Sequence, residues 1–357
     1  MKIAVYAIAK NEEKHVERFL RSCAGADGVF ILDTGSSDDT VAVARRLGAI
    51  VDQTVINPWR FDKARNESLK MVPYDYDLCI CLDLDELMPA NWRAAVEAAW
   101  APGMTGLRYE FVWSHKPDGT PDLVYWAQKA HARHGYAWKH PVHEVLHYDG
   151  AGPENLGLCA MTVHHWPDAS KSRSSYLPLL ELSVREDPDN DRNAHYYGRE
   201  LWFHGRLDEA EKELKRHLML PKAVWKPERA ASYRYLAKIA ESRGDKLQAV
   251  AWLQQACREA PDTREPWIEL AQLYYGSGDH EETYKAAKSC LLVGPERTKV
   301  YLTLDYAWGA LPHDLLAVSA FYLGHYREAV EAGREAVRLA PADARLIRNL
   351  SFYEERV

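Results

Sequence analysis

The chain has 357 residues, of which 47% are hydrophobic and 27% charged, a balance typical of soluble globular proteins and unlike that of disordered or fibrous chains. Its length exceeds what one hydrophobic core usually serves, so we expect two domains. Because 45 Lys and Arg face 52 Asp and Glu, the net charge of -7 argues against a nucleic-acid-binding or anionic-membrane-binding protein.

The cysteines and the apolar runs indicate the cellular compartment. Six cysteines are scattered without a repeated Cys-x-x-Cys pair, which argues against a disulfide framework or a zinc ribbon. The apolar run at 3–9 is short for a signal peptide and is followed by many charges, so we predict a buried first strand. No run approaches the roughly 20 apolar residues that cross a bilayer. We therefore expect a cytoplasmic protein without a transmembrane segment.

The first half alternates apolar runs of strand length with helical patterns. Strands are predicted at 3–9, 29–32, 50–55 and 78–82, and helices at 12–23, 40–47, 63–71 and 91–100. The polar residues 36–39 provide caps and negative charge where the helix at 40–47 begins, and Gly48 ends it. Such alternation predicts an α/β domain with a Rossmann-like, mostly parallel sheet, which binds ligands beyond the carboxyl ends of its strands.

After Trp166 the strand-like runs disappear and helical patterns continue to the end of the chain. We therefore predict one domain at 1–169 and an all-α domain at 170–357. Four glycines each precede a proline by 16 or 17 residues, namely Gly205, Gly244, Gly278 and Gly324 before Pro221, Pro261, Pro295 and Pro341. This pattern resembles tetratricopeptide (TPR) repeats, in which stacked helix pairs expose a concave binding surface. The alternative is an unspecialised solenoid that stabilises or dimerises the protein.

Polar clusters follow three of the predicted strands. They are Lys10, Asn11 and Glu12 after the first, Asp33 at the end of the second, and Asp83, Leu84, Asp85 and Glu86 after the strand at 78–82. We expect all three clusters to face one crevice. Alternate residues of an extended segment point the same way, so Asp83 and Asp85 present two carboxylates to one ligand. Hard oxygen ligands suit Mg²⁺ or Mn²⁺ bridging a diphosphate, whose charge the cation neutralises.

Four ordered motifs resemble those of family-two glycosyltransferases, particularly the branch whose catalytic domain precedes TPR repeats. They are A-K-N-E from Ala9, L-D-T-G-S-S-D-D-T from Leu32, F-D-K-A-R-N from Phe61 and L-D-L-D-E from Leu82. The resemblance is close over residues 1–90 and loose over 105–166. It implies a GT-A fold and metal-assisted, inverting transfer from a nucleotide-sugar donor that is usually UDP-linked. Because of the repeats, we expect a peptide or protein acceptor first and a glycan second.

The resemblance also implies roles for individual residues. Ala9, Lys10, Asn11 and Glu12 would line the nucleoside, and Asp33 would accept a hydrogen bond from the base. Asp83 would touch the ribose or the metal, with Leu84 beside it, and Asp85 would be the main metal ligand. Arg65 and Asn66 would steady the diphosphate or the base. The structural alternatives are a turn residue for Asp33 and a solvated helical charge for Arg65.

A further segment, W-x-x-x-V-H-E from Trp138, resembles the acceptor side of the same family. Glu144 is the candidate base that takes the acceptor's proton, and His143 would orient it or contact phosphate. The alternative for Glu144 is a salt bridge. In GT-A enzymes a C-terminal histidine completes the metal shell, which favours His165 here, with His164 as the alternative.

Two other functions compete with this interpretation. His143, Glu144 and His147 form a literal H-E-x-x-H, the zinc-protease motif, which requires a helix although Pro141 precedes it and Gly150 follows. Alternatively, the repeats are a protein-binding scaffold attached to an inactive transferase domain, against which the intact Asp33, Asp83 and Asp85 argue. A homodimer is also kept among the expectations, since the ends of solenoids often pair.

Overall fold

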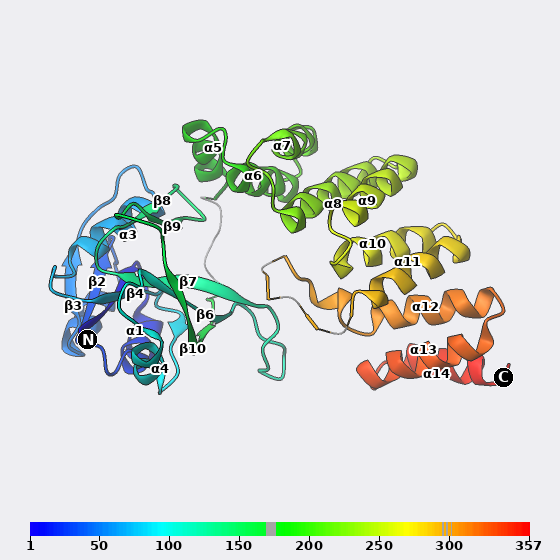
Figure 1. The fold of residues 1–357 in the computed structure, drawn as a ribbon, viewed down its shortest axis with the longest axis horizontal. Coiled ribbons are helices and arrows are strands. Elements are labelled where there is room, and N and C mark those ends of the chain that lie inside the picture. The colour runs from blue at the N-terminus through cyan, green and yellow to red at the C-terminus, as the bar shows by residue number, and fades with distance from the viewer. Residues whose placement is uncertain (169–175, 295, 298, 301) are drawn as a thin grey trace. The chain divides into compact units, whose positions relative to one another are not determined.

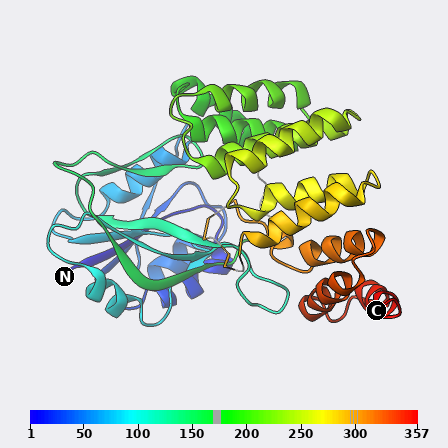
Figure 2. The same cartoon turned by 45° about the vertical axis from the view of Figure 1, so that its right-hand side comes forward.

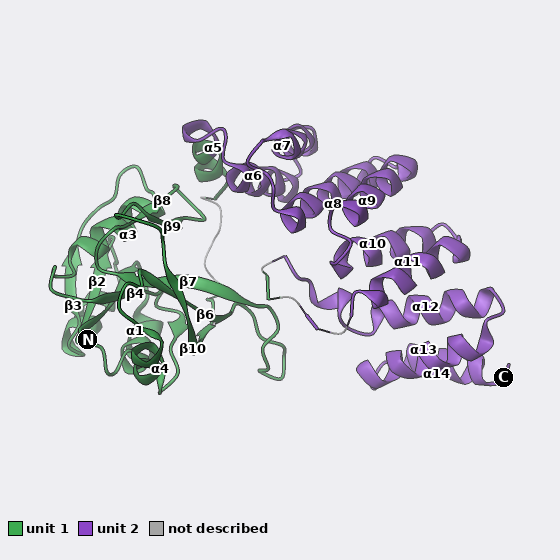
Figure 3. Ribbon diagram, in the orientation of Figure 1, with its two compact units in different colours: residues 1–183, 299–301 green, residues 184–298, 302–357 purple. Residues whose placement is uncertain are grey.

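The computed structural model describes residues 1–168, 176–294, 296–297, 299–300 and 302–357. The chain forms two compact units (Figure 3). Unit 1 comprises Met1–Ser183 with Lys299–Tyr301, and unit 2 comprises Val184–Thr298 with Leu302–Val357. The domain boundary predicted between residues 169 and 170 lies outside the described residues and stays a prediction.

Unit 1 is an α/β domain built on an eight-stranded sheet of order β3-β2-β1-β4-β7-β6-β10-β5 (Figure 1). The strands are β1 (Ile3–Ala9), β2 (Gly28–Asp33), β3 (Ile50–Gln53), β4 (Leu78–Cys81), β5 (Glu86–Leu87), β6 (Gly106–Val112), β7 (Val124–Ala132) and β10 (Leu156–His165). The helices are α1 (Glu13–Ser22), α2 (Thr40–Arg46), α3 (Phe61–Lys70) and α4 (Trp92–Ala99), and α5 (Tyr176–Glu186) begins here. A separate hairpin joins β8 (Tyr136–Lys139) and β9 (Val145–Tyr148).

Strand directions determine which loops meet. β1 pairs in parallel with both β2 and β4, and β3 pairs in parallel with β2. β7 is antiparallel to β4 and to β6, and β10 is parallel to β6. The carboxyl ends of β1, β2, β4, β6 and β10 therefore lie at one edge of the sheet. The predicted Rossmann-like architecture is confirmed.

The central strand β1 is buried on both faces. Alternate side chains of a strand point in opposite directions, so Val5 packs in one core cluster and Tyr6 in another. The cluster of Val5 includes Phe19 of α1 and Trp92 of α4, whereas that of Tyr6 includes Leu69 of α3. Helices on both faces thus hold the central strands, and the loops at their ends, in fixed positions.

Unit 2 consists of paired helices (Figure 2). They are α6 (Asp191–Phe203), α7 (Leu207–Met219), α8 (Lys226–Ser242), α9 (Lys246–Glu259), α10 (Arg264–Tyr275), α11 (His280–Leu292), α12 (Leu311–Tyr322), α13 (Tyr326–Leu339) and α14 (Ala344–Glu354), with a short 3₁₀ turn η1 (Asp305–Ala307). The predicted Gly205, Gly244, Gly278 and Gly324 occupy the turns within four pairs with φ of 70, 76, 75 and 80°. Positive φ favours glycine, which explains the sequence signal. Pro295 of the predicted pattern lies outside the described residues.

The helices of a pair pack closely. A Cβ atom added to Gly198 of α6 would lie 2.8 Å from Cγ of Leu214 on α7. The corresponding Ala237, Ala271 and Ala317 are buried. These small residues therefore let facing helices approach, and the helical solenoid predicted for this half of the chain is confirmed.

All six cysteines are free thiols buried in the two units. Cys23, Cys79, Cys81 and Cys159 belong to unit 1, and Cys257 and Cys290 to unit 2. In the ranges that the structure describes, none of the helices combines the length and the apolar character needed to span a bilayer.

Candidate functional site

Two loops at the carboxyl edge of the sheet are locked together. The backbone N–H of Asn11, after β1, donates to Ser36 Oγ at 2.8 Å, and the Asn11 side-chain oxygen accepts from the Ser37 N–H at 2.8 Å. The Glu12 N–H donates to Thr40 Oγ1 at 2.7 Å. Asn11 has a φ of 55°, a conformation that asparagine tolerates better than most residues. The predicted nucleoside-lining segment is therefore preformed, and Lys10 projects from it into solvent.

Asp33 ends β2 at the same edge and is fully buried. Its Oδ1 accepts from the N–H groups of Gly35 at 3.2 Å and Ser36 at 3.1 Å, and the Ser36 hydroxyl donates to its Oδ2. The carboxylate thus shapes the turn after β2, as expected if Asp33 is a turn residue. Its contact with a base stays a prediction. Ala9 contributes its carbonyl to the same junction, accepting from the Thr34 N–H at 2.8 Å.

Arg65 of α3 joins two predicted site residues. Its guanidinium forms ion pairs with Asp83 at 3.0 Å and with Glu144 at 2.5 Å. Although burial opposes ionisation of Asp83, the positive charges of Arg65 and Lys129 outweigh it and hold the pKa of Asp83 well below its usual range. Arg65 is only 6% exposed, so it is not the solvated helical charge of the alternative interpretation.

Asn66, next to Arg65, faces the β8 backbone. Its amide nitrogen donates to the Trp138 carbonyl at 2.8 Å, and its oxygen accepts from the Trp138 N–H at 2.9 Å. The Trp138 ring lies 5.1 Å from the Arg65 guanidinium and donates its indole N–H to Tyr6 OH at 2.8 Å. Asn66 therefore anchors the hairpin that supports Arg65. In the described structure its amide is engaged there, and its predicted contact with a nucleotide is not tested.

Lys129 of β7 is a site residue that the sequence did not indicate. Its Nζ lies 2.5 Å from Glu86 Oε1 and 3.8 Å from Asp83 Oδ2. Although burial opposes its charge, these two carboxylates raise the pKa of Lys129, so it stays protonated. Burial in turn raises the pKa of Glu86. The available signal was an isolated lysine in the strand-like segment 124–132, because a charge in a covered strand requires a partner.

Asp85 and His165 form the second predicted pair. His165 Nδ1 donates to the Trp113 carbonyl at 3.0 Å, and its Nε2 lies 3.4 Å from Asp85 Oδ2. Although burial lowers it, the hydrogen bond and charge of Asp85 raise the pKa of His165. His164 instead faces His115 at 2.9 Å. The structure thus places His165, and not His164, beside Asp85.

Asp85 and His165 fit a cation whose remaining ligands come from a bound substrate. Within the described residues no group of three His, Cys, Asp or Glu side chains converges on a metal position. Asp85 and His165 face each other, and the bond from Nδ1 to a carbonyl is the outer contact that metal-binding histidines usually make. Mg²⁺ is commonly held by one or two protein ligands together with phosphates and water. Asp83 already carries Arg65 and Lys129, and the side chain of Leu84 is buried in the core.

His143 and Glu144 lie in an irregular segment just before β9, and His147 lies within β9. His140 and His143 have positive φ values of 79 and 50°. A zinc-protease motif requires its two histidines on one face of a helix, so the structure contradicts that hypothesis. His147 pairs instead with Asp149 at 3.0 Å. Glu144 has the salt bridge of its structural alternative, which leaves its role as a base untested.

Comparison with known proteins finds different relatives for the two halves of the chain. Residues 5–106 match the model of glycosyl transferase family 2. An uncharacterized glycosyltransferase of Rickettsia conorii is 46% identical over 104 residues, which cover 28% of this chain and 34% of that protein, so the chain spans about a third of its length. A TPR repeat-containing protein of Synechococcus elongatus is 27% identical over 82% of this chain and 76% of its own. The solved structure of MamA protein is 17% identical, with a TM-score of 0.36 over 48% of this chain and 85% of its own. Residues 5–106 are thus similar to family 2 glycosyl transferases, and most of the chain is similar to a TPR repeat-containing protein.

Proposed function

We propose that residues 5–106 belong to a metal-assisted, inverting glycosyltransferase domain that uses a nucleotide-sugar donor, and that this donor is UDP-linked. The observation that carries the proposal is the Asp85–His165 pair, whose side chains lie 3.4 Å apart. The pair lies at the edge of the sheet where β1 and β2 end and the loops after them begin. Ligands of open α/β sheets bind at this edge.

The chain's own residues divide the work. The locked loops after β1 and β2, with Asn11 in the first and Asp33 just before the second, provide a rigid rim for the nucleoside. Asp85 and His165 would hold Mn²⁺ or Mg²⁺, which, when bound, supplies positive charge for the departing nucleoside diphosphate. Arg65 and Lys129 fix the carboxylate of Asp83 in one position, so that it receives the ribose or the cation without rearranging.

Glu144 is proposed as the group that takes the proton of the acceptor. Its carboxylate lies 2.5 Å from the Arg65 guanidinium, and this ion pair holds it in a fixed position. The Phe61 N–H, which opens α3, donates to the Pro141 carbonyl at 2.9 Å and thereby ties the Glu144 segment to the helix that carries Arg65.

The acceptor is proposed to be a peptide or protein, or else a glycan, held by the repeats. In support, α6 and α8 present an aromatic cluster in which the Trp202 and Tyr235 rings lie 5.3 Å apart and Phe203 is exposed. Lys238 lies 5.7 Å from the Trp202 ring. Rigid aromatic and cationic side chains of this kind are suited to extended ligands. A cytoplasmic location and a homodimer remain predictions.

The test is a donor-hydrolysis and thermal-shift screen against UDP-, GDP-, ADP- and CMP-sugars with Mn²⁺, Mg²⁺ or chelator. Wild-type protein is expected to hydrolyse one of these donors, and to do so only when a metal ion is present. The Asp85→Ala variant is expected to lose this activity. Asp75→Ala is the matched control, because Asp75 pairs with Lys2 on the surface. The absence of any response to all donors and metals would refute the proposal and favour the scaffold function.

A further inference from the structure

Lys129 and Glu86 form an ion pair that holds the turn after β4. Lys129 Nζ lies 2.5 Å from Glu86 Oε1, and the Glu86 side chain is only 2% exposed. Glu86 Oε2 accepts from the Asp83 N–H at 3.1 Å, and the Glu86 N–H donates to the Asp83 carbonyl at 2.9 Å. These two hydrogen bonds close the turn over residues 83–86. Glu86 therefore fixes both the turn and the position of the Lys129 ammonium group.

The Asp83 carboxylate is held by two cations. Arg65 Nη1 lies 3.0 Å from Asp83 Oδ1, and Lys129 Nζ lies 3.8 Å from Asp83 Oδ2. Oxygens that are engaged in this way have fewer lone pairs to offer a metal ion, and the two positive charges repel a cation that approaches them. Within the described residues, Asp83 does not converge with Asp85 and His165 on one metal position. The two cations account for this separation.

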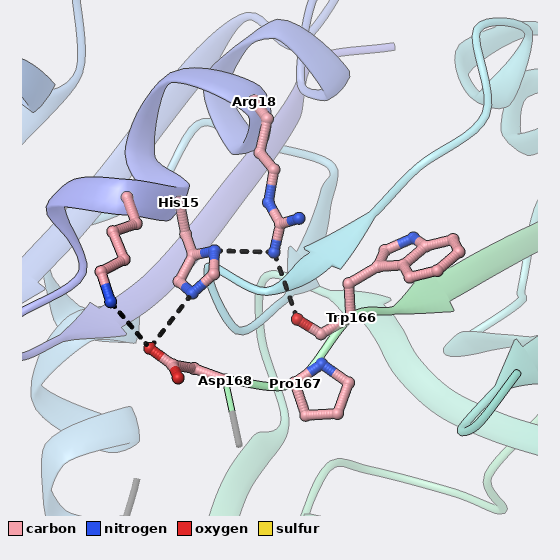
Figure 4. A pocket seen from close by; sticks show the side chains of 6 residues that line it. His15, Arg18, Trp166, Pro167 and Asp168 are labelled. Atoms are coloured by element: carbon pink, nitrogen blue, oxygen red, sulfur yellow. Dashed lines mark hydrogen bonds and ion pairs between the residues drawn. The ribbon is translucent and has the colours of Figure 1, made fainter. Parts of the chain in front are cut away.

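The proposed metal pair, Asp85 and His165, is anchored by contacts in which Lys129 takes no part. The Trp166 N–H donates to the Asp85 carbonyl at 2.8 Å, and β5 pairs with the end of β10. Figure 4 shows the next link, in which Arg18 of α1 donates to the Trp166 carbonyl at 3.2 Å. A substitution of Lys129 is therefore expected to release Asp83 and to leave the metal pair in place.

We propose that Lys129 is a positioning residue that keeps the Asp83 carboxylate out of the coordination shell of the metal ion. The inference rests on the proposed function, because it requires a cation at the Asp85–His165 pair. With Asp83 withheld, the protein supplies two ligands, and substrate phosphates and water supply the others. The protein without substrate then binds the cation weakly. Of the two roles expected for Asp83, contact with the ribose is the one that this arrangement favours.

The experiment measures binding of Mn²⁺ alone to the full-length protein at constant pH and ionic strength, by calorimetry and by the EPR signal of the free ion. Lys129→Met keeps the apolar stem, removes one of the two cations that hold Asp83, and is expected to tighten Mn²⁺ binding. Because loss of a positive charge by itself favours a cation, the gain is measured in two backgrounds. With Asp83 present it is expected to be about tenfold larger than in an Asp83→Asn background, the effect that outer partners of metal ligands commonly have.

Two further variants control for charge and for folding. Lys70→Met is the matched control, because Lys70 is 70% exposed on α3, and it is expected to bind Mn²⁺ like the wild type. Lys129→Met leaves Glu86 buried without its cation, so a second variant adds Glu86→Gln and removes both charges. The glutamine oxygen still accepts from the Asp83 N–H. Scanning calorimetry checks that each variant is folded, and the double variant is expected to show the same dependence on Asp83.

The outcomes separate this inference from the proposed function. Equal gains with and without Asp83 would overturn the positioning role, because Lys129 would then act only through its charge, and so would the absence of any gain. Asp85→Ala tests the metal pair itself. If it abolishes Mn²⁺ binding while the two gains are equal, only the positioning role is refuted. If it leaves Mn²⁺ binding unchanged in the wild type and in Lys129→Met, the metal pair is refuted and this inference falls with it.

Discussion

Replacing Arg65 with methionine tests whether the ion pairs at the centre of the site determine the stability of unit 1. The guanidinium, 6% exposed, is within 3.0 Å of Asp83 and 2.5 Å of Glu144. Methionine keeps much of the apolar volume and removes the charge. Two carboxylates then lose their shared partner.

The size of the effect follows from burial. Removing one partner of a buried ion pair costs about 3–5 kcal/mol, because the other charge is left uncompensated. Asp83 is 37% exposed and keeps Lys129 at 3.8 Å, so its share is small. Glu144 is only 11% exposed and carries most of the cost. We expect a loss of about 3 kcal/mol, which lowers the Tm of a domain of this size by about 6–12 °C.

The assay is scanning calorimetry of the full chain, with a double-mutant cycle. Glu144→Gln removes the charge that Arg65→Met leaves unpaired, so the double variant is expected to recover about 1.5 kcal/mol relative to the sum of the single losses. A melting point of Arg65→Met within about 2 °C of the wild type, or strictly additive losses, would refute the reasoning.

Three further predictions concern the supports of the two units. Asn66→Ala is expected to lower the free energy of unfolding of unit 1 by about 2 kcal/mol, measured in urea, because both hydrogen bonds to the Trp138 backbone are lost. Gly198→Ala is expected to cost unit 2 about 1–3 kcal/mol by calorimetry, because the added Cβ meets Leu214 at 2.8 Å. Burial lowers the pKa of His195 to about 3, below its value in the unfolded chain. Unit 2 is therefore expected to lose stability as the pH falls below about 6.5. In acid titrations followed by circular dichroism, His195→Asn is expected to flatten this pH dependence.

Each of these predictions has a control and a contrary outcome. Gly276→Ala adds a Cβ whose nearest neighbour is 3.4 Å away, so its cost is expected to stay below about 0.5 kcal/mol. If Gly198→Ala cost no more free energy of unfolding than Gly276→Ala, this result would contradict the packing argument. His204→Asn, at the exposed C-terminal end of α6, is expected to keep the pH dependence. An unchanged acid profile of His195→Asn, or an Asn66→Ala variant as stable as the wild type, would contradict the respective contact.

Much of the fold could be predicted because local patterns determine it. The alternation of apolar runs and helical patterns located β1 to β4 and α1 to α4 within a few residues, since these patterns are local. The glycines of unit 2 marked its turns because positive φ requires them. By contrast, β5 to β9 were not predicted. Their side chains are mixed in polarity, and their antiparallel pairing depends on distant strands.

The site was predictable as a set of motifs but not as a network. The sequence placed Asp85 and His165 in one centre through family resemblance, and the structure brings them together. It could not show that Arg65 joins Glu144, which lies 79 residues away. The adjacent Asn66 carried the same motif and performs a different task, because consecutive residues of a helix point in different directions. Such pairings depend on tertiary contacts that a local pattern does not encode.

The buried thiols provide a built-in kinetic probe of opening in each half of the molecule. Burial raises the pKa of Cys79 to about 12 and of Cys290 to about 12, so in the closed state neither forms the reactive thiolate at neutral pH. Alkylation therefore requires transient exposure, and its rate reports the free energy of that exposure. Mass spectrometry that resolves peptides containing Cys79 and Cys290 would follow the two units separately in one sample, including the response of each to a bound nucleotide sugar.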